Sequence, residues 1–465
     1  MRSTLKPSYL IGTATLIAGT ALVTGLGARS AGSADRTWNL ASELRGGRAK
    51  NVILFIGDGM GDSEITIARN YQLGARGRLT MDRLPFTGEY TTFALQESNP
   101  ALVDYVTDSA ASGTGWATGH KTSNGRISTV AGTTAVSPIP TILELAQRAG
   151  YKVGNVTTAE LTDATPAVLD SHINNRGCQG PADMGSCPAY KKEVGGPGSL
   201  AEQAVDHRVD VLLGGGRDRF AQTITGGPFA GKTVIQAAEA LGYDVVGDKT
   251  ALAGTTANKV LGLFNPGNMT LEWTGAQAAP FPGSGPQQCV ENQRELLSNE
   301  PSLADMTTKA IELLTDDGWL RRGHKGFFLQ VEGASIDKQD HVESPCQQIG
   351  ETIAFDNAIK VAINFARRNP DTLIVVTADH GHTSQIVPVP SASESVPRPG
   401  NLSTLLTKEG ALMGVNYGTR AHLQSQDHTG TQVRIAAQGP QAANVVGVTD
   451  QTDLFHTLAR ALGLE

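Results

Sequence analysis

Several common signals are absent from this chain of 465 residues. None of its four cysteines lie at the two-to-four-residue spacing of a cysteine zinc site, which argues against zinc held by cysteines alone. The acidic and histidine residues also do not follow the H-E-x-x-H spacing. The net charge of −7 argues against a nucleic acid as the main partner. Beyond the N-terminus, no segment is apolar and long enough to span a bilayer.

The N-terminus has the layout of a secretory signal peptide. Two basic residues precede an apolar stretch over about residues 9–26, and small residues follow up to Ala34. We therefore predict a signal peptide over 1–34, cleaved near Ala34, and a periplasmic or secreted mature chain that leaves the membrane after cleavage. A retained membrane anchor is the alternative, but the glycines and threonines of the stretch disfavour it.

Export would permit disulfide bonds among the cysteines. Cys178 and Cys187 are close in the sequence, so a bond between them would close a small loop. Cys289 and Cys346 would then form a long-range bridge. Four cysteines allow three connectivities, and unpaired thiols are the alternative.

Continuous apolar runs of strand length alternate with helical patterns along the chain. Most runs are apolar throughout, as in strands buried on both faces. The runs lie at 51–57, 152–158, 209–215, 326–333, 372–379 and 433–439. The helical patterns lie at 140–150, 303–317, 349–368 and 453–463.

This alternation predicts an α/β fold with a large, mainly parallel central sheet and helices on both faces. We expect an N-terminal extension over 35–50 and then a single domain over 51–465. Gly/Pro-rich stretches are interpreted as loops or small insertions within it, at 177–198, 221–232, 253–286 and 386–402.

Acidic residues and histidines follow several of the apolar runs. Ligands of open α/β sheets bind outside the carboxyl ends of the strands, so these side chains should meet in space. Asp337 and His341 are four residues apart and would share one face of a helical turn, from which both could bind one zinc ion. Helix capping by Asp58 and Asp379 is the simpler alternative, but the number of clusters favours a metal site. The clusters comprise Asp58, then Glu332, Asp337, Lys338 and His341, then Asp379, His380 and His382, and finally Asp427 and His428.

The acidic and histidine clusters lie in the segments "NVILFIGDGMGDSEIT", "GFFLQVEGASIDKQDH", "TADHGH" and "DHTGTQVRIAAQGPQAANVVG". Together with "YVTDSAAS", "TAELTDATPA" and "LLGGG", these segments look like the motifs of the bacterial periplasmic alkaline phosphatases, in that family's order. The chain resembles that family over nearly its whole mature length. The resemblance implies metal-dependent hydrolysis of a broad range of phosphate monoesters through a covalent phosphoserine at Ser109. It also implies a homodimer.

The resemblance further implies a role for each matching residue. Two zinc ions and one magnesium ion are expected, and zinc would lower the pKa of the Ser109 hydroxyl. The ligands of the first zinc would be Asp337, His341 and His428. The ligands of the second zinc would be Asp58, Asp379 and His380. Magnesium would be bound by Asp58, Thr165 and Glu332, and Asp163 would reach it through a water molecule. Arg176 would bind the phosphate directly, and Lys338 would reach it through a water molecule. His382 would lie behind the zinc ligands.

The resemblance also implies the disulfide bonds Cys178–Cys187 and Cys289–Cys346.

Some features depart from that pattern or leave alternatives. Gly113 and Gly115 stand where the family pattern leads us to expect helix formers, and Gly381 lies between His380 and His382. We expect these glycines to loosen the site. Lys338 could instead form a structural ion pair with a carboxylate. A phosphodiesterase of the same superfamily and a non-catalytic phosphate- or metal-binding protein are the alternative functions.

Overall fold

The computed structural model describes residues 40–293, 299–315, 325–391, 393–394 and 396–464. The signal peptide expected over 1–34 therefore lies outside the described residues. Residues 40–465 form one compact unit. Within its described part, no helix is both long and apolar enough to cross a membrane.

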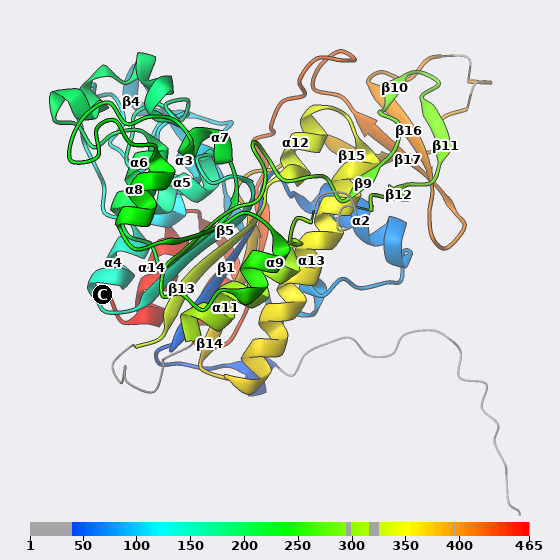
Figure 1. The fold of residues 1–465 in the computed structure, drawn as a ribbon. Coiled ribbons are helices and arrows are strands. Elements are labelled where there is room, and N and C mark those ends of the chain that lie inside the picture. The colour runs from blue at the N-terminus through cyan, green and yellow to red at the C-terminus, as the bar shows by residue number, and fades with distance from the viewer. Residues whose placement is uncertain (1–39, 294–298, 316–324, 392, 395, 465) are drawn as a thin grey trace, which may run out of the picture. The chain divides into compact units, whose positions relative to one another are not determined.

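Among the described residues, a sheet of ten strands forms the centre of this unit (Figure 1). Neighbouring strands are parallel, except that β18 runs antiparallel to both β14 and β2. The sheet is therefore mainly parallel, as predicted. Its order is β19 (Gly447–Asp450), β2 (Phe86–Thr91), β18 (Val433–Gln438), β14 (Thr372–Ala378), β1 (Asn51–Gly57), β13 (Phe327–Gly333), β5 (Lys152–Glu160), β6 (Val211–Gly215), β8 (Val260–Leu263) and β7 (Asp244–Val246).

The three central strands are buried along their whole length, which explains their continuous apolar sequences. β1 pairs with β13 on one side and β14 on the other, with Gly57 opposite Gly333 and Ala378. Because the strands are parallel and in register, their carboxyl ends lie at one edge of the sheet. Asp58 and Asp379 each follow a strand at that edge.

Helices cover both faces of the sheet, as predicted (Figure 1). On one face, α11 (Leu303–Thr315) packs against the long helix α13 (Pro345–Arg368). The other face carries α3 (Ser109–Thr118), α4 (Ile142–Arg148), α5 (Ala164–Asp170) and α14 (Asp453–Leu462). The other α-helices in the described part of the chain are α1 (Leu40–Glu43), α2 (Asp62–Leu73), α6 (Leu200–Asp206), α7 (Arg217–Phe220), α8 (Val234–Ala240), α9 (Lys249–Gly254) and α12 (Ser335–His341).

A smaller sheet lies beside the main one and corrects one predicted loop. Short strands form within 253–286, where glycine and proline predicted a loop, and β8 of the main sheet also lies there. Of the predicted loop 386–402, only the ends, 386–387 and 401–402, belong to strands, and the described residues between them form none. The buried run Val260–Leu263 is only four residues long and includes a glycine, which is too short an apolar pattern to predict a strand from the sequence. The smaller sheet consists of β10 (Ala279–Pro280), β11 (Ser284–Gln287), β15 (Ser384–Val387), β16 (Asn401–Leu406) and β17 (Leu412–Tyr417), and the other short strands are β3 (Ala94–Gln96), β4 (Asn99–Asp104), β9 (Trp273–Thr274) and β12 (Val290–Glu291).

Both expected disulfide bonds are present. Cys178 pairs with Cys187 across nine positions of sequence, and Cys289 pairs with Cys346 across 57. The second bridge links the segment after β11 to the start of α13.

Candidate active site

Ser109 is the first residue of α3. The preceding residue, Asp108, is the helix cap, and its side chain accepts a hydrogen bond of 2.9 Å from the backbone N–H of Ala111. The Ser109 side chain is thereby free of a capping role. Its Oγ lies 3.4 Å from Asp58 Oδ1 and 3.3 Å from His380 Nε2.

Asp58, Asp379 and His380 form a buried cluster beside this hydroxyl. His380 Nδ1 lies 3.3 Å from the carbonyl of Gly381. A carbonyl only accepts, so Nδ1 carries the proton and Nε2 faces the carboxylates with a lone pair. The distances from Nε2 are 3.1 Å to Asp379 Oδ2 and 3.5 Å to Asp58 Oδ1. Three electron-pair donors converging in this way suit a cation.

Neither aspartate caps a helix. α2 begins four residues after Asp58 and its cap is Gly61. Asp379 Oδ1 accepts hydrogen bonds of 2.9 Å from the backbone N–H groups of Gly59, in the loop after β1, and of the adjacent His380. The helix-capping alternative for both residues is therefore wrong.

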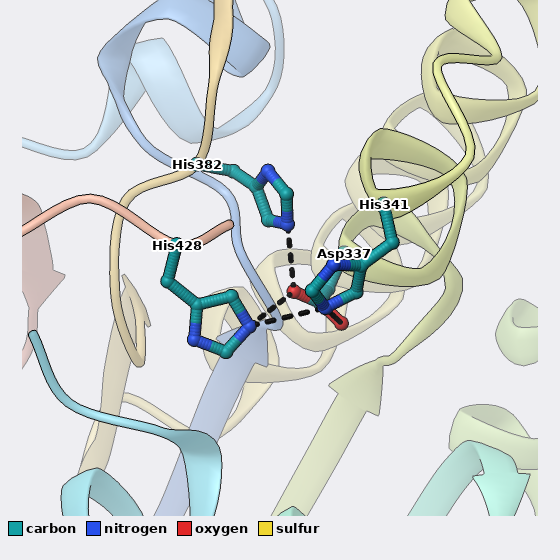
Figure 2. A group of neighbouring side chains, drawn as sticks. All are labelled: Asp337, His341, His382 and His428. Atoms are coloured by element: carbon teal, nitrogen blue, oxygen red, sulfur yellow. Dashed lines mark hydrogen bonds and ion pairs between the residues drawn. The ribbon is translucent and has the colours of Figure 1, made fainter. Parts of the chain in front are cut away.

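A second cluster surrounds the carboxylate of Asp337 (Figure 2). Asp337 and His341 lie one turn apart on α12, as their spacing predicted, and His428 approaches from a distant loop. Both histidines place Nδ1 against a backbone carbonyl, of Gln426 and Thr107 respectively. Their Nε2 atoms lie 3.3 and 3.2 Å from the Asp337 oxygens. In the neutral rings, the unprotonated Nε2 atoms and the carboxylate again face one another.

His382 joins this cluster in a different tautomer. Its Nδ1 accepts a hydrogen bond of 2.9 Å from the backbone N–H of Thr383, so the proton resides on Nε2. That nitrogen lies 3.3 Å from Asp337 Oδ1 and points at it (Figure 2). Burial lowers the pKa of His382 to about 4, which keeps the ring neutral. His382 therefore orients Asp337 and has no lone pair to offer a metal there.

Asp58, Glu332 and Thr165 are buried, and burial disfavours the charged form of both carboxyl groups. Burial raises the pKa of Glu332 to about 8, even though Thr157 Oγ1 donates a hydrogen bond to it. Burial and then the charges of Asp379 and Asp337 raise the pKa of Asp58. Thr165 Oγ1 is buried without a hydrogen-bond partner. A hard cation such as Mg²⁺ would supply the missing charge to such an oxygen set.

Two basic side chains meet at Asp163, which caps α5. Arg176 donates a hydrogen bond of 2.8 Å to Asp163 Oδ1 and another of 3.2 Å to Asp108 Oδ2. Lys338 donates one of 2.6 Å to Asp163 Oδ2. Burial opposes ionisation of Asp163, but the charges of Lys338 and Arg176 outweigh it and hold its pKa below the usual range. The ion pair proposed as the alternative for Lys338 thus exists. Asp163 holds both cations, and Arg176 also contacts Asp108, the cap of α3.

Several supporting residues were not predicted from the sequence. Asp108 holds both α3 and Arg176. Ser112 Oγ donates a hydrogen bond of 2.7 Å to the carbonyl of Asp379, and Gln451 donates one of 3.0 Å to the same oxygen. Ser112 stands one helical turn after Ser109, and that spacing could have indicated it. Gln451 comes from a distant segment and carries no local signal.

The glycines expected to loosen the site instead permit close packing. A Cβ at Gly113 would lie 2.8 Å from Cγ1 of Val168, on α5. One at Gly381 would lie 2.4 Å from Cγ2 of Thr431. Both contacts are shorter than atoms tolerate. The expectation of a loosened site is therefore not supported at these two positions.

A cleft of about 700 Å³ opens beside Asp108, His341 and His428. Asn124, Arg420 and Asp427 also line it. It is wide enough for a substrate to approach both the Asp337 cluster and the start of α3.

Comparisons with known proteins bear on these residues. The family model described as alkaline phosphatase matches residues 49–421 and 403–464. The chain is 52% identical over 419 residues to streptomycin-6-phosphate phosphatase of Streptomyces griseus, covering 90% of this chain and 91% of that protein. It is 50% identical over 439 residues to alkaline phosphatase of Escherichia coli, covering 93% and 90%. The structure of Thermus thermophilus alkaline phosphatase matches with a TM-score of 0.67 at 22% identity, covering 91% of this chain and 94% of that one.

Proposed function

Because the chain belongs to the alkaline phosphatase family and is a metal-dependent hydrolase of phosphate monoesters, we propose that Ser109 is its nucleophile. The observation that carries this proposal is the position of its Oγ. It lies at the N-terminus of α3, 3.3 Å from His380 Nε2, at the edge of the sheet where the carboxylates gather. The helix dipole and the free N–H groups there favour the negative charge of an alkoxide and of a phosphoryl group.

The donor sets fit three cations. We propose zinc at Asp337, His341 and His428, and a second zinc at Asp58, Asp379 and His380. The support is the bare Nε2 atoms that face carboxylates, since imidazole and carboxylate together suit zinc. The oxygen-only set of Asp58, Thr165 and Glu332 suits magnesium, and the unpartnered Thr165 hydroxyl supports it. When bound, the ions would supply Lewis-acid charge that favours ionised oxygen at Ser109 and on the phosphoryl group.

Arg176 and Lys338 give the substrate phosphate its contacts with the chain. The planar guanidinium of Arg176 can donate to two phosphoryl oxygens at once. Asp108 and Asp163 hold that plane from one side, at 3.2 and 2.8 Å. A third of the Arg176 side chain is exposed, at 32%, which leaves it accessible to a substrate. Lys338 is held by Asp163 and acts at longer range.

The reaction on these residues has two displacements. In the first, the Ser109 hydroxyl loses its proton to solvent, a bond forms between Ser109 Oγ and phosphorus, and the bond from phosphorus to the alcohol oxygen breaks. The alcohol leaves with a proton from solvent. In the second, a water molecule loses a proton to solvent as its oxygen attacks phosphorus, and the bond from phosphorus to Ser109 Oγ breaks. Ser109 Oγ regains a proton from solvent, and inorganic phosphate leaves. Arg176 holds the phosphoryl oxygens in both displacements. Few contacts reach beyond the phosphate, and the open cleft supports a broad range of alcohols.

The direct test is hydrolysis of p-nitrophenyl phosphate by the purified mature chain, after treatment with chelator and again with zinc and magnesium restored. We expect activity to fall with chelator and to return with both metals. Arg176→Ala should weaken inhibition by inorganic phosphate more than Arg176→Lys does, because lysine keeps the charge without the fork. Hydrolysis that survives chelation, or equal inhibition of both variants and the wild type, would contradict the assignment.

We also propose that the chain is exported and forms a homodimer. The layout of residues 1–34 and the two disulfide bonds support export. Family membership supports the dimer. Fractionation of an expressing bacterium and light scattering of the mature chain test these two proposals, and a cytoplasmic precursor or a monomer would refute them.

A further inference from the structure

Three metal-binding side chains converge outside the clusters described above. Glu144 belongs to α4, His172 follows α5, and His207 is the C-terminal cap of α6. Their candidate ligand atoms all lie within 4.8 Å of one another. Glu144 Oε1 is 3.3 Å from His172 Nε2 and 3.6 Å from His207 Nε2. The three residues come from separate elements that the fold brings together.

Hydrogen bonds fix which nitrogen of each ring carries the proton. His172 Nδ1 lies 2.9 Å from the carbonyl oxygen of Ser128, and His207 Nδ1 contacts that of Asp170. Because carbonyls only accept, each Nδ1 is protonated, and in the neutral rings each Nε2 presents a lone pair to Glu144. Two lone pairs and a carboxylate facing one another repel unless a cation lies between them.

The same arrangement holds His341 and His428 around Asp337. There, too, each Nδ1 faces a backbone carbonyl and each Nε2 faces a carboxylate. A backbone carbonyl behind a histidine is the usual support of a metal ligand, since it sets the tautomer and the ring orientation.

The spacing at Glu144 fits tetrahedral zinc. Ligands about 2.0–2.2 Å from the ion stand about 3.3–3.6 Å apart in a tetrahedron, the range of the two measured distances. Glu144 Oε2 accepts a hydrogen bond of 3.0 Å from the backbone N–H of Thr141, which holds the carboxylate in place. The His207 side chain is 28% exposed, so water can reach a fourth position.

We propose that Glu144, His172 and His207 bind a zinc ion outside the catalytic centre, with water as the fourth ligand. The ion would join α4 and α6 to the segment that follows α5. That segment reaches Arg176 four residues after His172. The competing occupant is a proton, which would turn the cluster into a histidine–glutamate ion pair.

Metal content and anomalous diffraction distinguish the two occupants. Wild type, His207→Asn, Glu144→Gln and His120→Asn would each be saturated with zinc and magnesium chlorides, desalted, and analysed by mass spectrometry of the metals. His207→Asn keeps a donor for the Asp170 carbonyl and removes Nε2, and Glu144→Gln keeps an oxygen for the cap of α4. His120 is exposed and outside all the clusters, so its variant is the matched control.

We expect both cluster variants to hold one zinc per chain fewer than wild type and His120→Asn, while they still hydrolyse p-nitrophenyl phosphate. Crystals of wild type measured at the zinc edge should show an anomalous peak between the three ligand atoms. Equal zinc in all four proteins, no such peak in wild type, or a peak that persists in His207→Asn would overturn the proposal. The anomalous map of the wild-type crystal shows whether zinc occupies the cluster even if a variant fails to fold. Anomalous peaks at the active site lie elsewhere in that map, so they test the proposed catalytic metals separately.

Discussion

Replacing Gly113 with alanine perturbs the contact between the helix that begins at Ser109 and the helix that begins after Asp163. The new Cβ would lie 2.8 and 2.9 Å from the two methyl carbons of Val168. Carbon atoms prefer about 3.5–4.0 Å, so α3 and α5 would have to separate by about 0.6–1 Å. Ser109 and Thr165 would move apart with them.

The expected loss follows from these distances. Alanine favours a helix over glycine by about 1 kcal/mol, but overpacking a core costs about 1–3 kcal/mol, so the variant should be no more stable than wild type. A displacement of about 1 Å at a reacting group can cost about 100-fold in rate. We therefore expect kcat toward p-nitrophenyl phosphate to fall roughly 10- to 100-fold, with a smaller change in KM.

The assay compares Gly113→Ala with Val168→Ala and the double variant. Val168→Ala removes both methyl groups that the new Cβ meets, so the double variant should recover part of the kcat lost in Gly113→Ala. Gly254→Ala is the control, because Gly254 ends the exposed helix α9 and a Cβ there meets nothing within 4 Å. It should leave activity unchanged. Full activity in Gly113→Ala, or no recovery in the double variant, would refute the packing argument.

The other predictions concern stability. Closing the longer loop should stabilise more, at about 4 kcal/mol for Cys289–Cys346 against about 3 kcal/mol for Cys178–Cys187. The variant with serine at both Cys289 and Cys346 should therefore unfold at a lower urea concentration than the variant with serine at both Cys178 and Cys187. Asp82 forms ion pairs with Arg69 at 3.3 Å and with Arg434 at 2.7 Å. Burial opposes ionisation of Asp82, but the hydrogen bond and charge of Arg434 and the charge of Arg69 lower its pKa. The stability that Asp82 contributes is therefore present above about pH 4 and is lost as pH falls through the folded pKa. Asp82→Asn should therefore lose about 2 kcal/mol at pH 7 and converge with wild type in acid, and equal loss at both pH values would contradict this.

The strands of the sheet centre could be predicted from sequence because they are buried on both faces. The apolar runs at 51–57 and 372–379 match β1 and β14 to within a residue. β2 was missed because one face of it is exposed and its sequence, "FTGEYT", contains a glycine and a glutamate. Short strands such as β15 and β16 depend on pairing with segments far along the chain, which no local pattern records.

The candidate site was predictable where residue type and spacing carry the chemistry. Asp337 and His341 share a helical turn, and Asp58 and Asp379 follow parallel strands, so local rules place them. The tautomer of His382 was not predictable, because the backbone N–H of Thr383 sets it. The cluster of Glu144, His172 and His207 could not be predicted from the sequence either, because its residues are far apart along the chain and meet only through the packing of three segments.

Covalent trapping tests the central claim most directly. The metal-loaded mature enzyme would be incubated with labelled inorganic phosphate at acid pH, quenched, digested and mapped by mass spectrometry, with Ser109→Ala beside it. The account predicts one phosphopeptide, modified at Ser109, and no label in the variant. Label on another residue, or label that persists in Ser109→Ala, would contradict it.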